Sequence, residues 1–363
     1  MASTMVDEGP DEVEIALFAY EVAKVRAGAI TAAMVHLGDR LGLYRTLADL
    51  ERPVSSAELA DAAGLVERWV REWLYNQAAA GLVLVDDAER FSLSAAGAVV
   101  LADPDHEANL AGMFHSLPQT MQRLERLPDS FRTGVGYDYD AHGPDGAIGI
   151  ERTFEPWMRA HLVADVVPLL DDVVARLEAG ATVADVGCGS GGVVLELAAA
   201  FPASQIVGYE ISHLALDRAG ARLAERGLAN VEFRHGGDEP IPDDGSFALV
   251  ATCDCLHDMT DPAGMARTIR GAVAEDGTWL LIDIKAYDTY AENVAHNPVA
   301  AMMYGESVMS CMSSGLSEPG GAGLGTLGLS ARRAEAIARD AGFTRFRQLD
   351  VDHAVNAFYE IRP

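Results

Sequence analysis

The spacing of apolar residues changes partway along this chain. From residue 181 onward, short apolar runs alternate with segments that are apolar on one helical face. They predict strands at 182–187, 205–210, 231–235, 247–252 and 278–283, and helices at 191–200, 213–226, 262–274 and 331–341. Such alternation is typical of an α/β fold in which helices cover both faces of a parallel sheet. The last two strands, 344–351 and 356–361, are too close for a crossover helix, so we expect an antiparallel pair.

The N-terminal part of the chain has a different pattern. Apolar residues recur at helical spacing through 12–50, and a capping box at Ser55–Glu58 begins a short helix that ends at Gly64. A helix over 66–80 and two short strands at 82–85 and 90–93 follow, which is the order of a winged-helix domain. We therefore expect three regions. They are a mostly α winged-helix-like domain at 1–103, a helical connector and pocket lid at 104–180, and a Rossmann-like α/β domain at 181–363.

A winged-helix order suggests nucleic-acid binding, but the charge of the chain argues against that function. Lys and Arg total 27 against 55 Asp and Glu, a formal net charge of −28, and such a surface repels phosphate backbones and anionic lipid. The large side chains of the helix at 66–80 suit a core or an interface. They are Trp69, Trp73, Leu74 and Tyr75. We expect this domain to form a homodimer and to bind no nucleic acid.

Apolar runs and cysteines give no sign of membrane insertion or secretion. No apolar run reaches the eighteen or so residues that span a bilayer, and Met1 to Asp11 lacks the features of a signal peptide. The four cysteines, Cys188, Cys253, Cys255 and Cys311, are too few and too scattered for a disulfide framework. We therefore expect a cytoplasmic protein with no membrane partner.

A glycine-rich turn follows the first strand of the α/β region. The segment from Val183 to Gly192 places glycines where the backbone must turn tightly and approach a ligand closely. Glu210, at the tip of the next strand, can accept hydrogen bonds from ribose hydroxyls. This arrangement holds an adenosine-bearing cofactor, but the spacing alone fits both S-adenosylmethionine (SAM) and a dinucleotide.

Two further segments and the terminal strand pair favour SAM. With Gly237-Asp238 and Leu256-His257-Asp258-Met259-Thr260-Asp261, nearly the whole chain resembles class I SAM-dependent methyltransferases with an N-terminal winged-helix dimerisation domain. The resemblance is greatest to small-molecule O-methyltransferases of secondary metabolism and to an actinobacterial branch of this architecture. It implies SAM as methyl donor, S-adenosyl-L-homocysteine as product, and a small-molecule acceptor methylated at oxygen. Met259 departs from the tryptophan that such enzymes carry.

The resemblance and the glycine turn together predict the cofactor site. Asp185 could accept from the ammonium of SAM, Gly191 rather than Gly192 would be the third glycine, and Cys253 would be an apolar wall. The residues predicted to bind the cofactor are Asp185, Gly187, Cys188, Gly189, Gly191, Glu210, Ile211, Gly237, Asp238 and Cys253.

The candidate catalytic residues follow the fourth and fifth strands. His257 comes five residues after a strand that ends at the ligand-binding edge, and its pKa suits general-base work. Asp283, at the end of the next strand, could orient the imidazole. Asp258 could hold the loop or bind a metal. The alternative for His257 is a residue that caps the following helix or fills a loop.

Two other functions stay open from the sequence. Some relatives methylate α-keto acids at carbon and hold the substrate on a metal bound by histidines. His257 matches one such ligand, but Ser310 stands where the second is expected, so His296 is the substitute candidate and the metal is uncertain. A SAM-sensing transcription regulator built on the winged helix is the alternative from another class.

Overall fold

The computed structural model describes residues 11–363, so the first ten residues of the 1–103 region lie outside it. The chain separates into two compact units, residues 1–117 and 118–363. Residues 104–117 belong with the N-terminal unit and residues 118–180 with the C-terminal one. None of the helices within 11–363 combines the length and apolar character needed to cross a bilayer.

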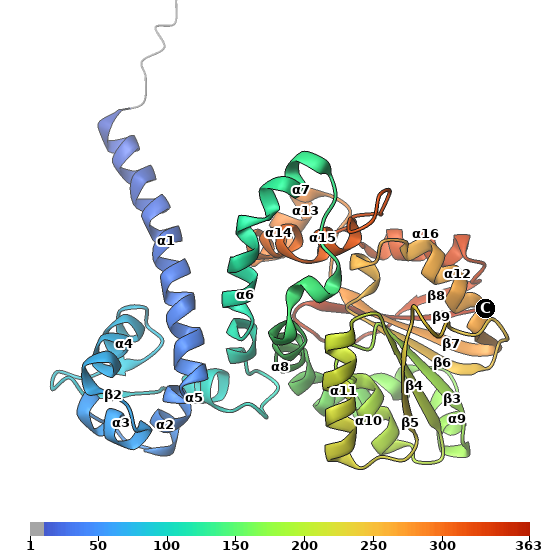
Figure 1. Cartoon of the computed structure of the whole chain (residues 1–363), viewed down its shortest axis with the longest axis horizontal. Helices are drawn as coiled ribbons and strands as arrows, with labels where there is room; N and C mark the ends of the chain where they lie inside the picture. Colours follow the sequence, from blue (N-terminus) through green and yellow to red (C-terminus); the bar gives the residue numbers. More distant parts are fainter. Residues whose placement is uncertain (1–10) are drawn as a thin grey trace, which may run out of the picture. The chain divides into compact units, whose positions relative to one another are not determined.

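The N-terminal unit has the helix order that the sequence predicts. Ser55 and Glu58 form both hydrogen bonds of the capping box, and Gly64 ends the helix with a φ of +66°. Beyond this helix, Trp73 and Leu74 are buried, whereas Trp69 is 79% exposed. The elements of the unit (Figure 1) are α1 (Glu12–Arg40), α2 (Leu43–Asp49), α3 (Ser56–Ala63), α4 (Glu67–Ala79), β1 (Leu84–Val85), β2 (Phe91–Ser92), α5 (Ala95–Ala102) and η1 (Ala111–Phe114).

A seven-stranded sheet forms the middle of the C-terminal unit, in the order β5-β4-β3-β6-β7-β9-β8. Its strands are β3 (Thr182–Val186), β4 (Gln205–Glu210), β5 (Val231–His235), β6 (Phe247–Cys253), β7 (Val273–Ile284), β8 (Arg345–Gln348) and β9 (Asn356–Arg362). The pairs β5–β4, β4–β3, β3–β6 and β6–β7 are parallel, while β9 is antiparallel to both β7 and β8. The α/β fold with an antiparallel terminal pair is therefore confirmed.

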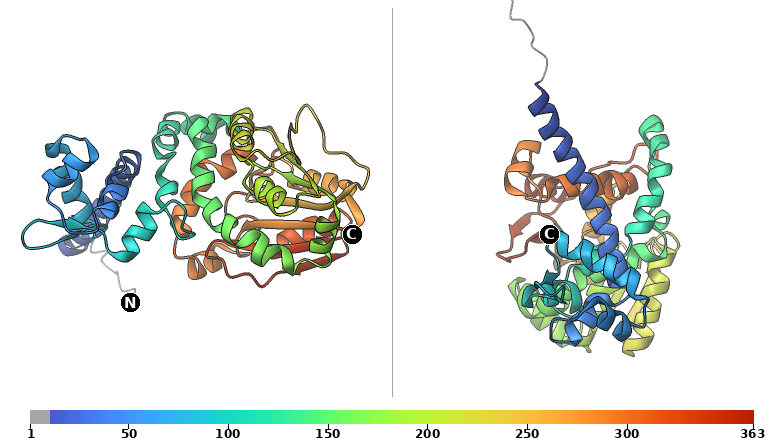
Figure 2. Two further views of the ribbon diagram at one scale, coloured as in Figure 1. Left: turned by 90° about the horizontal axis from the view of Figure 1, so that it is seen from below. Right: turned by 90° about the vertical axis from the view of Figure 1, so that its left-hand side faces the viewer.

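Helices cover both faces of this sheet (Figure 2). Successive strand residues point into different layers, so Val183 and Leu280 join one core while Ala184 and Leu281 join the other. The first layer contains α8 (Pro144–His161), α9 (Val173–Ala179) and α10 (Gly192–Ala200), with α11 (His213–Arg226) beside α8 and α10. The second contains α12 (Pro262–Ala272) and α16 (Ala331–Asp340).

Short helical segments account for most of the remaining chain in this unit. They are α6 (Leu117–Gln122), η2 (Arg123–Glu125), α7 (Leu127–Thr133), η3 (Tyr139–His142), η4 (Leu162–Val166), η5 (Val167–Leu169), η6 (Leu256–Asp258), α13 (Tyr290–His296), α14 (Ala300–Met309) and α15 (Cys311–Gly315). Backbone hydrogen bonds join two distant segments, because the amide of Gly136 donates to the carbonyl of Leu316 at 2.9 Å. The segment before α8 therefore packs on α15, close to η6.

Candidate active site

His257 and Asp283 form a buried pair at the carboxyl ends of β6 and β7. The imidazole Nδ1 lies 2.6 Å from Asp283 Oδ1, and the two residues are 2% and 1% exposed. The same carboxylate oxygen accepts the backbone amide of Ile284 at 2.7 Å. An acceptor at Nδ1 sets the neutral imidazole in the tautomer whose Nε2 is free to take a proton. The structure thus brings together the two residues that the sequence paired.

Buried acids surround this histidine. Burial opposes the charged form of His257, but the charge of Asp283 overcomes it and raises the pKa well above its ordinary value. Burial also raises the pKa of Asp258 to about 7. Cys311 also acts on the ring and helps to raise the pKa of His257. Helix α15, which begins at Cys311, packs on the η6 turn that carries His257.

Asp254 belongs to the same cluster, although the sequence reasoning did not single it out. Its φ of +50° is unusual for a residue with a side chain. One carboxylate oxygen accepts from the Asn356 amide, while Oδ2 is buried without a partner, and burial raises the pKa to about 7. The sequence signal for Asp254 was its place soon after a predicted strand, two residues before the Leu256–Asp261 segment.

The glycine turn has the backbone that the motif requires. Gly187, Gly189 and Gly191 have φ values of +73°, +53° and +83°, where a side chain is strained. A Cβ at Gly187 would meet Cys255 and one at Gly191 would meet Phe233, but a Cβ at Gly189 would enter open space. The backbone at Gly189 can therefore approach a ligand closely.

The two acids predicted for the cofactor are buried beside this turn. Glu210 accepts the amides of Gly189, Ile211 and Ser212 at 2.8, 2.7 and 2.9 Å. Asp185 is 1% exposed, its Oδ1 has no partner, and burial raises its pKa to about 8. A buried carboxylate oxygen without a donor fits a cationic group such as the ammonium of SAM.

The other predicted cofactor residues lie at the same edge in varied settings. Ile211 is 66% exposed, which leaves an apolar side chain available to a planar ring. Asp238 is exposed and pairs with His235 Nδ1 at 3.0 Å, and the other nitrogen of that histidine lies 3.0 Å from the Ile211 carbonyl. Gly237 adjoins the same His235 ring. Cys188 is buried below the turn, and Cys253 ends β6 half-buried.

The histidine proposed as a second metal ligand lies elsewhere. His296 is exposed at the end of α13, where its ring contacts Tyr287 at 4.9 Å between centroids. A different histidine, His142, reaches the Ser310 hydroxyl at 3.4 Å. Across residues 11–363, no group of three or more His, Cys, Asp or Glu side chains is arranged to hold a metal ion.

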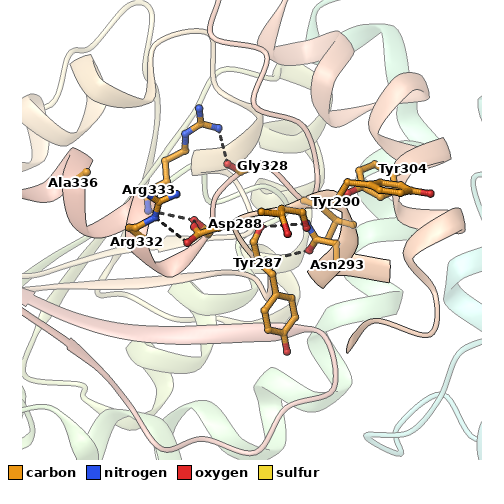
Figure 3. Close-up of a pocket in the computed structure, with 12 residues that line it drawn as sticks. Tyr287, Asp288, Tyr290, Asn293, Tyr304, Gly328, Arg332, Arg333 and Ala336 are labelled. Carbon is orange, nitrogen blue, oxygen red and sulfur yellow. Dashed lines mark hydrogen bonds and ion pairs between the residues drawn. The ribbon is translucent and has the colours of Figure 1, made fainter. Parts of the chain in front are cut away.

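A pocket of about 440 Å³ lies beside α13 and α16, apart from the predicted site (Figure 3). The rings of Tyr290 and Tyr304, two of its lining residues, meet at a tilt of 38° with centroids 5.8 Å apart. On the opposite wall Asp288 pairs with Arg332 at 2.8 Å. None of its lining residues is among the predicted catalytic or cofactor residues.

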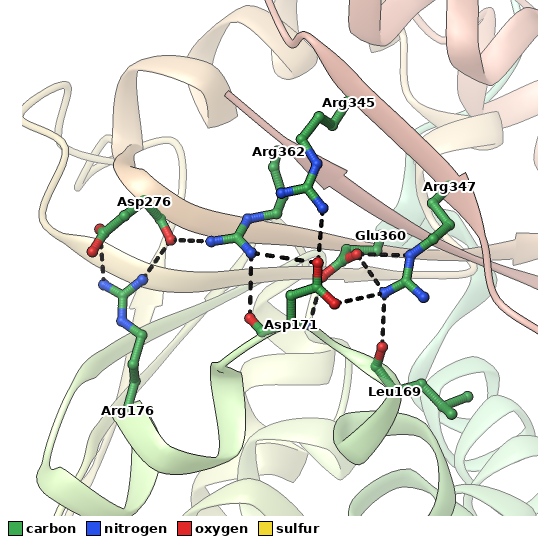
Figure 4. A network of polar contacts seen from close by, with 8 residues as sticks. All are labelled: Leu169, Asp171, Arg176, Asp276, Arg345, Arg347, Glu360 and Arg362. Atoms are coloured by element: carbon green, nitrogen blue, oxygen red, sulfur yellow. Dashed lines mark hydrogen bonds and ion pairs between the residues drawn. The ribbon is translucent and has the colours of Figure 1, made fainter.

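A second polar cluster, which we call the clasp, ties the terminal strands to the loop after η5 (Figure 4). Arg345 and Arg347 donate to the Asp171 carboxylate at 2.7 and 3.3 Å. Glu360, 2% exposed, accepts from the Asp171 amide at 2.7 Å and from Arg347 at 2.6 Å. The remaining members of the clasp are Arg176, Asp276 and Arg362.

Two family models match the chain along most of its described length. A model described as a methyltransferase domain matches residues 177–324. A model described as an Rv2258c-like winged HTH domain matches residues 29–103. Their order agrees with the two units of the structure.

Curated relatives match over different lengths. The mitomycin biosynthesis 6-O-methyltransferase of Streptomyces lavendulae is 27% identical over 304 residues, which cover 78% of this chain and 82% of that enzyme. The polyketide synthase ThaQ of Burkholderia thailandensis is 32% identical over 105 residues, 29% of this chain, but the chain spans only 5% of that protein.

Solved structures share the fold over nearly the whole chain. Human N-acetylserotonin methyltransferase in complex with SAM superposes with a TM-score of 0.68 at 16% identity, covering 100% of this chain and 99% of that one. The O-methyltransferase NcsB1 from neocarzinostatin biosynthesis, in complex with SAM and 2-hydroxy-5-methyl naphthoic acid, gives 0.60 at 19% identity over 92% and 95% of the chains. The chain therefore contains a methyltransferase domain preceded by a winged helix-turn-helix domain, and it shares the fold of solved SAM-dependent methyltransferases.

Proposed function

We propose that this protein transfers the methyl group of SAM to a hydroxyl oxygen of a small molecule, with His257 as general base. The observation that carries the proposal is the buried pair of His257 Nδ1 and Asp283 Oδ1, 2.6 Å apart. It holds the imidazole in one tautomer and leaves Nε2 to face the acceptor. When bound, SAM supplies an electrophilic methyl group on a sulfonium.

His257 and Asp283 have different roles in the proton transfer. His257 Nε2 takes the proton of the acceptor hydroxyl, so that the oxygen becomes a better nucleophile. Asp283 stabilises the imidazolium that forms, and its bond to the Ile284 amide keeps the carboxylate in place. Burial of the pair excludes water, which strengthens this electrostatic support.

Cofactor binding is assigned to the edge formed by the glycine turn and the tip of β4. Open space above Gly189 admits a ligand against the backbone, and the unpartnered Asp185 oxygen suits an ammonium group. Glu210 has three of its lone-pair positions occupied by backbone amides, which leaves one for a ribose hydroxyl. Exposed Ile211 would cover the adenine.

The names of the relatives support oxygen as the methylated atom and secondary metabolism as the setting. One curated relative is a 6-O-methyltransferase of mitomycin biosynthesis. A structural neighbour from neocarzinostatin biosynthesis is an O-methyltransferase bound to a hydroxylated naphthoic acid. We therefore propose a planar hydroxylated acceptor.

Methyl transfer from labelled SAM to a panel of naphthols and hydroxynaphthoic acids tests the proposal. We expect His257→Ala to lower kcat by about 10²- to 10⁴-fold, the range of general-base catalysis, while calorimetry shows unchanged SAM binding. The matched control is His296→Ala, since His296 is exposed and contacts Tyr287. Full activity of His257→Ala would refute the base. Chelator-sensitive activity that His296→Ala abolishes would instead favour the metal-assisted C-methyltransferase.

The winged-helix domain is proposed to join two copies of the chain rather than to bind nucleic acid. Both arginines of the would-be recognition helix pair with acids on the same helix, Arg68 with Glu72 at 2.5 Å and Arg71 with Glu67 at 3.1 Å. Helix α1 exposes large apolar side chains, including Phe18 at 72%, which suit a partner surface. Light scattering should give a dimer, and Phe18→Glu should shift it toward monomer. Salt-sensitive DNA binding would support the transcription regulator instead.

The compartment proposed for the enzyme is the cytoplasm. All four cysteines are free thiols in the structure, and free thiols persist in a reducing compartment. Fractionation of the cells that make the protein would test this, and recovery outside the cytoplasm would contradict it.

A further inference from the structure

Arg123, in the short η2 turn after α6, is a buried cation. It is 8% exposed, although arginine is rarely buried without a partner. Its guanidinium donates to Thr120 Oγ1 at 3.1 Å through Nη2 and contacts His142 Nδ1 through Nη1, while Nε is buried with no partner. Both side-chain partners are uncharged.

No carboxylate in residues 11–363 forms an ion pair with Arg123. Glu306, exposed on α14, influences the guanidinium only through space. His142 is no counter-ion either, because an imidazole is neutral or positively charged, and burial and the neighbouring Arg123 lower its pKa to about 3, so that it stays neutral. A buried charge that lacks a counter-ion is costly, so its retention calls for an anion from outside the chain.

His142 extends this polar group toward serine hydroxyls. Because Nδ1 faces the Arg123 donor, the neutral ring carries its proton on Nε2. That nitrogen lies 3.4 Å from Ser310 Oγ and 3.5 Å from Ser314 Oγ. Arg123, His142, Ser310 and Ser314 therefore form one group, which we call the cationic subsite.

The cationic subsite adjoins the reaction centre. Ser310 directly precedes Cys311, whose thiol acts on the pKa of His257. On its other side, the ring of Tyr139 packs on His142 with centroids 5.0 Å apart, and the charges of Asp258 and Glu210 act on the Tyr139 hydroxyl. Ser314 lies in α15 and Ser310 directly precedes it, so the cationic subsite includes residues of the helix that packs on the η6 turn of His257.

We propose that the cationic subsite binds a carboxylate of the acceptor, so that the substrate is a hydroxylated aromatic carboxylic acid. The inference rests on the proposed methyl transfer, and it names the substrate class of that same site. A carboxylate would take the free Nε–H of Arg123 and the hydroxyls of Ser310 and Ser314, which satisfies the orphaned donor. A neutral acceptor would leave Arg123 buried without its counter-ion.

Calorimetry on the enzyme saturated with S-adenosylhomocysteine tests binding without turnover. The probes are a hydroxynaphthoic acid, its carboxamide and the matching naphthol. We expect the acid to bind about 10- to 100-fold more tightly than the carboxamide, in keeping with charge-assisted hydrogen bonds. This comparison needs no variant, so it stands even if a variant fails to fold.

Variants then locate the preference. Arg123→Gln should remove the preference for the acid, and Arg123→Lys should keep part of it. Arg132→Gln is the matched control, because Arg132 is exposed and pairs with Asp129 at 2.9 Å. It should retain the full preference.

The outcomes separate this inference from the proposed function. Equal affinity for acid and carboxamide, or a preference that survives in Arg123→Gln, would overturn the cationic subsite while methylation of naphthols still supported the proposed function. Arg123-dependent binding of the acid, with no methyl transfer to any probe, would support the subsite and refute the O-methylation. Tighter Arg123-dependent binding of a naphthyl phosphate than of the acid would overturn the assignment to a carboxylate.

Discussion

Two polar clusters occupy opposite ends of the same sheet, and they differ in how completely their charges are paired. In the clasp, every buried side-chain nitrogen and oxygen of its members has a hydrogen-bond partner. At the carboxyl edge of the parallel strands, by contrast, Asp185 Oδ1, Asp254 Oδ2 and Asp283 Oδ2 are buried without one.

Complete pairing is what a structural cluster needs, because an orphaned buried group costs free energy. Orphaned groups gathered at the carboxyl edge of a parallel sheet are instead the mark of a site that a ligand completes. The difference shows where this molecule gives up stability for function. Substitutions in the clasp and among the unpaired acids can test it.

The largest effect is expected from Asp283→Asn, at the centre of the orphaned cluster. Asparagine cannot hold the His257 tautomer or stabilise its imidazolium, so kcat should fall by about 10³-fold or more. A base must be deprotonated to act, so kcat/KM falls as the pH decreases through the pKa of His257. Because this pKa is raised, the acidic limb of the pH profile should lie above the ordinary histidine range. That limb should move to lower pH in the variant. Asp288→Asn, on the separate pocket, is the control, and an unmoved limb would contradict the pairing.

The next largest effect is expected from Glu360→Ala, at the centre of the clasp. The change leaves a backbone amide and Arg347 without their shared carboxylate. We expect the free energy of unfolding to fall by about 2–3 kcal/mol, with kcat unchanged. Urea denaturation measures it, and Glu232→Ala, in an exposed pair with Arg234, should cost far less. Loss of activity under conditions where the variant is fully folded would show that the clasp is not merely structural.

Asp254→Asn should stabilise the ligand-free protein at high pH. The pKa of Asp254 is about 7 in the folded state, above the unfolded value near 4, so its favourable contribution is present at low pH and is lost as pH rises through 7. The variant should therefore gain about 1–2 kcal/mol over the parent at pH 8 and little at pH 5. Asparagine also tolerates the left-handed backbone at this position. Thermal unfolding at the two pH values measures the difference, and an equal effect at both would contradict it.

Asp171→Asn should have the smallest effect and the opposite dependence on pH. The hydrogen bond from Arg345 lowers the pKa of Asp171, with help from Arg347 and Arg362. Its contribution is therefore present above the unfolded pKa and is lost as pH falls through the folded one. Because these side chains are half-exposed, the loss at pH 7 should be about 0.5–1 kcal/mol. The same unfolding measurements should show the variant and the parent converging as the pH falls below the ordinary aspartate range.

Regular elements were predictable because their signals are local. The capping box of Ser55 and Glu58 and the strand at 205–210 depend on a few neighbouring residues, and both occur as predicted. Strand β7 begins at Val273, five residues earlier than predicted, because its start pairs with Phe247 across the sheet. That pairing is not visible in the local pattern.

The reaction centre was predictable only where the sheet itself determines proximity. His257 and Asp283 follow adjacent parallel strands, whose carboxyl ends meet at one edge. The same reasoning placed His296 near the site because it follows β7 in the chain, yet α13 carries it to the surface. Whether His257 acts as the base stays a prediction.

The sequence by itself determined the α/β class, the glycine turn and the histidine–acid pair, because each depends on residues close in the chain or on neighbouring strands. Only the tertiary structure decided which irregular segments meet at that pair. Arg123 and His142 precede the sheet, and Ser310 lies 168 residues after His142. Such contacts follow from how short helical turns pack, and no periodic pattern encodes that packing.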